Sequence, residues 1–327
     1  MAERGGCQTA VLFLNMGGPD SLDAVRPFLR NLFFDPVIID LPAVFRRPLA
    51  SFLSARRALK VYPRYERIGG KSPIGSITRD QAKAVQEILG PCFGPVLPAF
   101  SYWHPFISEA VEKASLSGAE SLVALSLYPQ YCRATTGTCM QDVSMNLPGT
   151  PFEDSTRLID SWATHPLYLQ ALAGTAREAL SRIPEEQQDD AVILFSAHGV
   201  PESLIKGGDP YLEQTFATVD GVMARLQGRV HHVAFQSRLG PVKWIQPSLS
   251  DKLKELSAKG APPLVIVPVS FVSDHIETLY ELDIQHRQIA HDLGFTIYER
   301  APALNTRPDF IAALADLVRS AEPHAPE

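Results

Sequence analysis

Short apolar runs that alternate with amphipathic stretches are the feature that most constrains the fold of this chain. The apolar runs are typical of buried strands and cover residues 10–14, 122–127, 192–195, 264–269 and, as a final short piece, 296–298. Helical periodicity fills much of the sequence between and after them, at residues 80–89, 107–115, 166–180, 247–257 and 308–319. Strands and helices in alternation form parallel sheets that helices cover on both faces. The sequence therefore predicts an α/β fold.

The chain is long enough for two domains, and its two halves share a plan. Its 327 residues are about twice the usual domain length. Residues 12–19 (LFLNMGGP) align with residues 194–201 (LFSAHGVP), each at the end of the first strand of its half. We predict one domain over residues 1–155 and a second over residues 156–307.

The ends of these strands are where a ligand is expected. In open α/β sheets, ligands bind beyond the carboxyl ends of the strands. Met16 and His198 each follow the first strand of their half, and His275 and Glu277 follow a later strand of the second half. Two such domains that face each other would bring these side chains to one cleft.

Composition excludes several classes of protein. A net charge of −6 disfavours nucleic acid as a partner, and 45% hydrophobic with 20% charged residues is ordinary for a globular protein. No apolar run approaches the roughly 20 residues that span a bilayer. The amino terminus enters the first strand without a signal-like segment, and the four cysteines are too scattered for a standard zinc site. We therefore expect a cytoplasmic protein with reduced thiols.

Residues 273–281 (SDHIETLYE) bring three carboxylates into one predicted helix. With Asp274 at the N-cap, the side chains of Asp274, Glu277 and Glu281 share one helix face. Like charges repel each other, so a cation, a proton relay or exposure to water must tolerate them. The structural alternative is a capping box of Asp274 and Glu277, with Glu281 in solvent. His275 adds a group that exchanges protons near neutral pH.

The segment from residue 32 to residue 70, called the lip below, mixes apolar and basic side chains. Glu66 is the only acid between Arg46 and Arg67, a stretch that contains seven basic residues when both ends are counted. This composition is typical of a surface that touches a membrane or a large, flat, anionic apolar ligand. We expect a peripheral membrane contact through residues 32–57. The alternative is a helical subdomain that packs on the sheet with its arginines in water.

A set of short motifs is spread in order over nearly the whole chain. In the first half these are residues 14–19 (LNMGGP), 67–74 (RIGGKSPI), 102–105 (YWHP), 128–131 (YPQY) and 135–137 (TTG). In the second half they are residues 195–201 (FSAHGVP), 208–211 (GDPY), 235–241 (FQSRLGP) and 273–281 (SDHIETLYE). By this ordered set the chain resembles the ferrochelatases, enzymes that insert ferrous iron into a porphyrin to make haem.

The resemblance implies a fold and an activity. The fold is two Rossmann-like domains, each a parallel β-sheet flanked by helices, with the active-site cleft between them. A C-terminal helix at residues 308–320 is expected to pack on the first domain. The activity is that of a lyase that inserts Fe2+ into protoporphyrin IX and releases two protons. Porphyrin and ferrous iron are its substrates, and no permanent cofactor is expected.

The resemblance also assigns the reacting residues. His198 and Glu277 match the family's active-site histidine and its acidic partner. An imidazole suits the uptake of pyrrole protons, and the pair supplies one nitrogen and one oxygen donor for transient binding of Fe2+. Asp274, His275 and Glu281 match a shell along the helix and are expected to relay protons or metal.

Porphyrin contacts are expected from both halves. Met16 matches a position where members that act on coproporphyrin tend to carry tyrosine, so it favours protoporphyrin IX. Aromatic and apolar side chains can line the pocket, and basic or hydroxyl groups can anchor the propionates. These further candidates are Tyr102, Trp244, Phe271, Leu279, Arg64, Lys71 and Ser72.

Some members of the family carry a [2Fe–2S] cluster, which we do not expect in this chain. The animal type uses cysteines of a C-terminal extension, whereas this chain ends without cysteine, and Arg133 fills the remaining cluster position.

Three alternatives stay open: a coproporphyrin III ferrochelatase, a cobalt or nickel chelatase, and a porphyrin- or haem-binding carrier without turnover. A carrier needs no base, so His198 and Glu277 disfavour it, and the long apolar lip disfavours the cobalt and nickel chelatases. The protein is expected in the cytoplasm, as a peripheral protein on the inner face of the membrane if the lip binds lipid.

Overall fold

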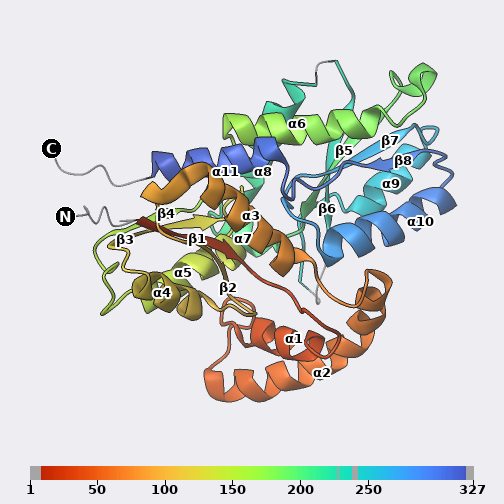
Figure 1. The fold of residues 1–327 in the computed structure, drawn as a ribbon. Helices are drawn as coiled ribbons and strands as arrows, with labels where there is room; N and C mark the ends of the chain where they lie inside the picture. The colour runs from red at the N-terminus through yellow and green to blue at the C-terminus, as the bar shows by residue number, and fades with distance from the viewer. Residues whose placement is uncertain (1–8, 227, 238–241, 322–327) are drawn as a thin grey trace. The chain divides into compact units, whose positions relative to one another are not determined.

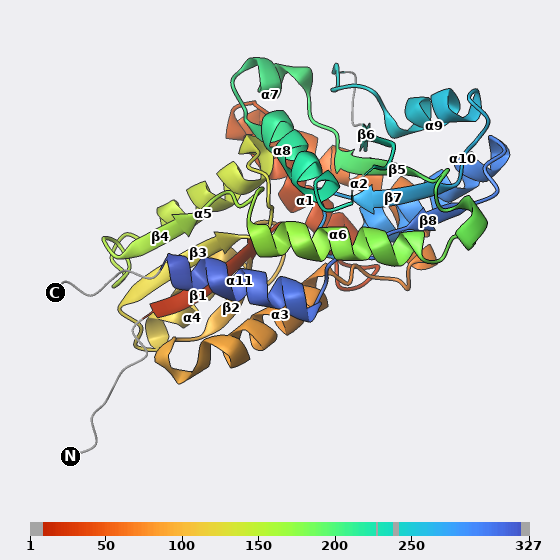
Figure 2. The ribbon, with the colours of Figure 1, turned by 90° about the horizontal axis from the view of Figure 1, so that it is seen from above.

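The computed structural model describes residues 9–226, 228–237 and 242–321 of the chain. These residues form two compact units (Figures 1 and 2). The first contains the chain up to Trp162 and the segment from Ile311 onward, and the second runs from Ala163 to Phe310. Each unit holds one parallel four-stranded sheet. The expected α/β fold with two parallel sheets flanked by helices is confirmed.

The first unit is built on a sheet with the strand order β2-β1-β3-β4. Its strands are β1 (Thr9–Asn15), β2 (Val96–Phe100), β3 (Ser121–Ser126) and β4 (Thr156–Ile159). Every residue of β1 is buried, as expected for a central parallel strand that helices cover on both faces.

Four helices flank this sheet. Leu12 and Leu14 belong to a core shared with α4 (Ile107–Leu116) and α5 (Thr138–Asn146) on one face. The other face is covered by α3 (Ile74–Leu89) and α11 (Pro308–Ser320) (Figure 1). There the guanidinium of Arg319 donates to the carbonyl of Ile88 over 2.8 Å. The C-terminal helix therefore lies mostly within the first unit.

The second unit repeats this strand order as β6-β5-β7-β8. Its strands are β5 (Val192–His198), β6 (His231–Gln236), β7 (Leu264–Pro268) and β8 (Tyr298–Arg300). One face packs on α9 (Leu249–Ser257) and α10 (Arg287–Asp292). The other is covered by α6 (Pro166–Leu180) and α8 (Tyr211–Met223) (Figure 1). The aligned pieces 12–19 and 194–201 thus begin in equivalent central strands.

The lip consists mainly of one long helix. Helix α2 (Ala43–Arg67) packs along α1 (Val25–Phe34) within the first unit. It turns small side chains and one tyrosine inward, at Ala50, Ser54, Ala58, Val61 and Tyr65. Its outer surface exposes Val44, Phe45, Phe52 and Leu59 by 72%, 64%, 59% and 73%, respectively. The segment is therefore a helical subdomain that also keeps an exposed apolar surface.

Several short elements complete the fold. They are the 3-10 turns η1 (Gly90–Cys92) and η3 (Glu185–Gln187), the π-helices η2 (Arg133–Gly137) and η4 (Glu277–His286), and helix α7 (Glu202–Lys206). Within the described ranges, no helix is both long enough and apolar enough to cross a membrane. The cysteines in these ranges, Cys92, Cys132 and Cys139, form no disulfide there, and Cys7 lies outside the described residues.

Candidate active site

His198 is the last residue of the central strand β5, at the carboxyl end of the second sheet. Its main chain is held on both sides, because its carbonyl accepts a hydrogen bond from Tyr211 Oη and its N–H donates to Ser270 Oγ, over 2.9 and 3.4 Å. Tyr211 and Ser270 also share a hydroxyl–hydroxyl bond of 2.7 Å. The imidazole itself stays 36% exposed. The site thus presents the ring to a ligand on a fixed backbone.

Gly199 lets the chain turn tightly after His198. Its N–H donates to the carbonyl of Gln236 over 2.7 Å. A Cβ at this position would lie 2.8 Å from that carbonyl oxygen, closer than a carbon atom can approach, and 3.4 Å from the ring of Trp244. Only glycine keeps the ends of β5 and β6 this close. Trp244 therefore lies beside the turn that follows His198.

The imidazole of His198 is paired with Glu277. Nδ1 of His198 and Oε2 of Glu277 are 2.9 Å apart, and the Glu277 side chain is 21% exposed. A carboxylate can only accept, so Nδ1 carries the shared proton and Nε2 of the neutral ring keeps a lone pair. The carboxylate thereby fixes the tautomer in which His198 can accept a second proton at Nε2.

The electrostatics of this pair favour its charged form. Burial lowers the pKa of His198, but the charge of Glu277 and its hydrogen bond, with the charge of Glu281, raise that pKa above its ordinary value. Burial raises the pKa of Glu277, but the charge and hydrogen bond of His198, and those of His275, bring that pKa well below its usual range. The raised pKa makes His198 a stronger proton acceptor, because Glu277 stabilises the imidazolium that forms.

His275 lies on the other side of the Glu277 carboxylate. Its Nε2 is 3.5 Å from Glu277 Oε2, and its Nδ1 is 3.1 Å from the carbonyl of Ser273. The ring of Phe271 contacts both imidazoles, with centroid distances of 4.9 Å to His275 and 6.2 Å to His198. The structure thus brings four predicted site residues of the second unit together: His198, Phe271, His275 and Glu277.

The helix that carries Glu277 differs from the predicted one. The expectation of an α-helix with Asp274 at its N-cap is wrong, because the π-helix η4 begins at Glu277 after Ile276. Asp274 instead accepts from Thr278 Oγ1 over 2.8 Å, and Thr278 Oγ1 accepts from the N–H of His275 over 3.0 Å. Glu277 therefore closes no capping box and is available to His198. π-Helical turns are rare and frequently occur at functional sites.

Glu281 is held by residues that the sequence reasoning did not single out. Its Oε2 accepts from Ser237 Oγ over 2.5 Å and from Gln236 Nε2 over 3.3 Å. Gln236 Nε2 also donates to the carbonyl of Glu277, and Gln236 Oε1 accepts from Ser196 Oγ over 2.7 Å. Gln236 and Ser237 lie in the motif 235–241, which was the available signal; its residues 238–241 lie outside the described residues.

In the first unit, Met16 and Tyr102 lie at the ends of neighbouring strands. Met16 is half-buried; its N–H donates to Asn15 Oδ1 and Tyr128 Oη, and its carbonyl accepts from the N–H of Tyr102. The Tyr102 side chain is buried, and its hydroxyl donates to Asp35 Oδ2 over 2.5 Å. Burial, with the charge of Asp35, raises the pKa of Tyr102 far above its ordinary value. Tyr102 thus anchors the part of the lip between α1 and α2.

The other predicted porphyrin contacts differ in exposure. Ser72 is buried against Gly18, where a Cβ would meet its side chain at 2.7 Å, and Lys71 is exposed. The rest are half-buried, Arg64 in the first unit and Trp244, Phe271 and Leu279 in the second.

The family model and the relatives identified by sequence agree on one family. A family model described as Ferrochelatase matches residues 8–322. The chain is 47% identical over 318 residues to "Ferrochelatase" of Geobacter metallireducens, covering 96% of this chain and 98% of that protein. It is 46% identical over 314 residues to "Ferrochelatase" of Geotalea daltonii, covering 96% and 98%. Its structure is similar to that of SirB from Bacillus subtilis with Fe3+, with a TM-score of 0.60 at 10% identity over 96% of this chain and 95% of that chain. At that identity the structural likeness extends to the fold alone.

Proposed function

The chain belongs to the ferrochelatase family, and from this premise we propose that it inserts Fe2+ into protoporphyrin IX, forms protohaem and releases two protons. The observation that carries the proposal is the 2.9 Å hydrogen bond between His198 and Glu277 at the carboxyl end of β5. Coproporphyrin III is the less favoured substrate, since Met16 occupies the position where enzymes of that type tend to carry tyrosine.

The pair can perform the proton transfer that metallation needs. Iron enters as Fe2+ and two pyrrole N–H protons leave, so charge balances only if a base removes them. Nε2 of His198 accepts a pyrrole proton, and the charge of Glu277 stabilises the imidazolium that forms. His275 and Glu281 flank Glu277 and are proposed to pass the proton on toward solvent. His198 and Glu277 also offer one nitrogen and one oxygen donor, a sparse set that holds Fe2+ only transiently.

We keep the porphyrin contacts as part of the proposal. Met16, Phe271, Trp244 and Leu279 are half-buried apolar or aromatic side chains that suit a flat π-system. Arg64 and Lys71 are the proposed propionate anchors. Tyr102 and Ser72 are buried. In this proposal they support the residues that contact the porphyrin and do not stack on the ring themselves.

Anaerobic iron insertion with two porphyrins tests the function. The protein is expected to metallate protoporphyrin IX with a higher kcat/KM than coproporphyrin III, because the thioether of Met16 replaces a phenol that suits the more polar substrate. Met16→Tyr is the matched variant and is expected to raise the relative rate with coproporphyrin III. A parent preference for coproporphyrin III would contradict the substrate assignment, and porphyrin binding without turnover would indicate a carrier.

We also propose that the protein is cytoplasmic and touches the inner face of the membrane through its lip. The exposed Phe45 and Phe52 lie seven residues apart on one side of α2, and Arg47 and Arg56 are exposed nearby. Apolar side chains that insert among lipids, with arginines beside anionic headgroups, are typical of an interfacial helix. Phe33 is only 6% exposed and packs inside the lip, so it contributes no such contact.

Sedimentation with liposomes of phosphatidylcholine and phosphatidylglycerol checks the lip. The parent is expected to sediment with the vesicles, and the double variant Phe45→Ser, Phe52→Ser to stay largely in the supernatant, because two inserted rings are lost. Phe216→Ser is the control, since this ring is 44% exposed in the second unit. The idea fails if the parent does not sediment, or if the control loses as much binding as the double variant.

A further inference from the structure

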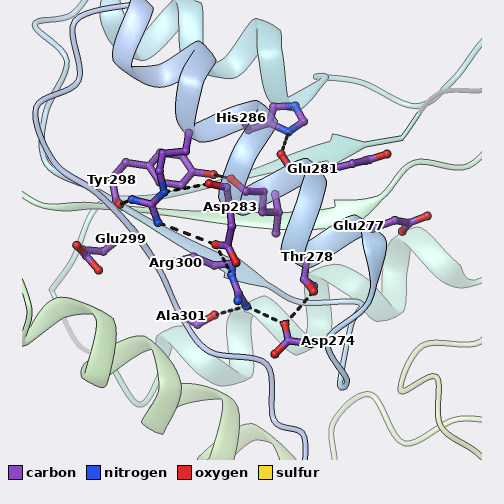
Figure 3. Close-up of polar contacts among 12 residues, drawn as sticks. Asp274, Glu277, Thr278, Glu281, Asp283, His286, Tyr298, Glu299, Arg300 and Ala301 are labelled. Carbon is purple, nitrogen blue, oxygen red and sulfur yellow. Dashed lines mark hydrogen bonds and ion pairs between the residues drawn. The ribbon is translucent and has the colours of Figure 1, made fainter. Parts of the chain in front are cut away.

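Arg300 lies between two carboxylates of the segment that carries Glu277 (Figure 3). Its Nη1 is 3.2 Å from Asp274 Oδ1, and its Nε donates to Asp283 Oδ1 over 2.7 Å. The exposed fractions of the three side chains are 11% for Arg300, 17% for Asp274 and 27% for Asp283. One guanidinium on β8 therefore binds both the entry to the π-helix η4 and the middle of that helix.

Asn305 adds a second hold on Asp274. Its Nδ2 donates to Asp274 Oδ2 over 2.8 Å, and its Oδ1 accepts from the N–H of Asp274 over 2.9 Å. With Thr278 and Arg300 on Oδ1, both oxygens of Asp274 are engaged by protein groups. A carboxylate engaged in this way by three side chains has a structural role.

The contacts of Arg300 with Asp274 and Asp283, called the clamp below, lie on the side of η4 that faces away from the side chains of Glu277 and Glu281. Figure 3 shows the side chains of Glu277 and Glu281 projecting away from Arg300. A π-helix lacks the i→i+4 bonds of an α-helix and is rarely stable by itself, so outside contacts must hold it. The bond from Glu277 to His198 also depends on the placement of the helix, and a functional site tolerates errors of only about 0.5 Å.

We propose that Arg300 is a positioning residue for iron insertion. By clamping Asp274 and Asp283 it holds η4 so that Glu277 stays within hydrogen-bond distance of His198. The inference rests on the proposed function, because it treats that pair as the reacting one. Asp274 then belongs to the clamp, and the proton relay consists of His275, Glu277 and Glu281.

Arg300→Met tests the clamp, with Arg307→Met as its matched control. Arg307 also bridges two acids of the second unit, Glu178 and Asp309, at 2.6 and 3.3 Å. Arg300→Met is expected to lower kcat for iron insertion about tenfold, because Glu277 moves from its place, and to leave KM for porphyrin within about twofold. Arg307→Met is expected to keep the parent kcat. Equal losses in both variants would overturn the proposal.

A double-mutant cycle separates positioning from a general structural effect. If Arg300 acts through Glu277, adding Arg300→Met to Glu277→Gln lowers kcat no further. Losses that multiply in the double variant would overturn the proposal. Arg300→Lys is expected to recover part of kcat, since a lysine can bind one of the two acids. Should Arg300→Met fail to fold, Asp283→Asn removes one arm of the clamp and goes through the same cycle.

An NMR measurement keeps the two proposals distinguishable. The 15N chemical shifts of the His198 imidazole report its bond to Glu277 whether or not iron is inserted. A change in Arg300→Met that is absent in Arg307→Met supports the clamp, even if an inactive parent removes the proposed function. Unchanged shifts in a folded Arg300→Met overturn the clamp, even if the parent metallates porphyrin.

Discussion

Replacing His198 by alanine is expected to reduce kcat for iron insertion into protoporphyrin IX about a thousandfold, within the range that general base catalysis contributes. Its Nε2 is the proposed acceptor of pyrrole protons, and alanine offers no basic group in its place. Porphyrin affinity is expected to change less than threefold, because an alanine leaves the β5 backbone in place. Anaerobic turnover and the quenching of intrinsic fluorescence by porphyrin measure the two quantities.

His291→Ala is the control for this experiment. His291 lies on α10 of the same unit, and its side chain is 80% exposed beside Asp292. It is expected to keep the parent kcat. A loss of less than tenfold in His198→Ala would show that another group removes the protons. A loss of porphyrin affinity as large as the loss of kcat would show that His198 binds substrate and does not act as a base.

Glu277→Gln is expected to lower kcat about a hundredfold, because the amide cannot stabilise the imidazolium of His198 as a charge does.

The same variant is expected to change how the free energy of unfolding depends on pH. The folded-state pKa of His198 is raised above its ordinary value of 6.5. The contribution of His198 to the free energy of unfolding is therefore full below pH 6.5 and is lost as pH rises through the raised value. The pKa of Glu277 is depressed below its ordinary 4.5, so that contribution is full above 4.5 and is lost as pH falls toward the folded-state value.

The difference in free energy of unfolding between parent and Glu277→Gln should therefore be largest between about pH 4.5 and 6.5 and shrink on both sides. Urea unfolding across this pH range measures it. Glu255→Gln is the control: the hydrogen bonds and charges of Lys252 and Lys259 lower the pKa of Glu255 to about 2, so its contribution is lost only as pH falls. If the difference for Glu277→Gln also stays constant through the neutral range, the stabilising bond to His198 is absent in solution.

The central strands could be predicted from the sequence, whereas the edge strands β2, β4 and β6 could not, and the edge strand β8 was placed two residues too early. β1, β3, β5 and β7 are covered on both faces, so burial selects continuous apolar runs that periodicity detects. The edge strand β2 contains Pro98, β4 is half-exposed, and β6 begins with two histidines. The last strand, β8, begins at Tyr298, two residues later than residue 296. Edge strands carry weaker apolar signals because one side of each lacks a neighbouring strand.

The proposed reacting residues were visible in the motifs, but their arrangement was not. The motifs 195–201 and 273–281 singled out His198 and Glu277, and the structure brings these two within 2.9 Å. Spacing alone predicted an α-helix capped by Asp274, whereas the chain forms a π-helix. Nor did the motif around Tyr102 reveal that its hydroxyl is bound to Asp35.

The sequence by itself determined the α/β class, the central strands and the family, and it singled out His198 and Glu277 as the proposed base and its acidic partner. Local patterns carry this information because burial and reactivity act on the residue types themselves. Only the tertiary structure decided which carboxylate reaches His198 and which is held by Arg300 and Asn305. These bonds join residues far apart in the chain, so no local periodicity encodes them.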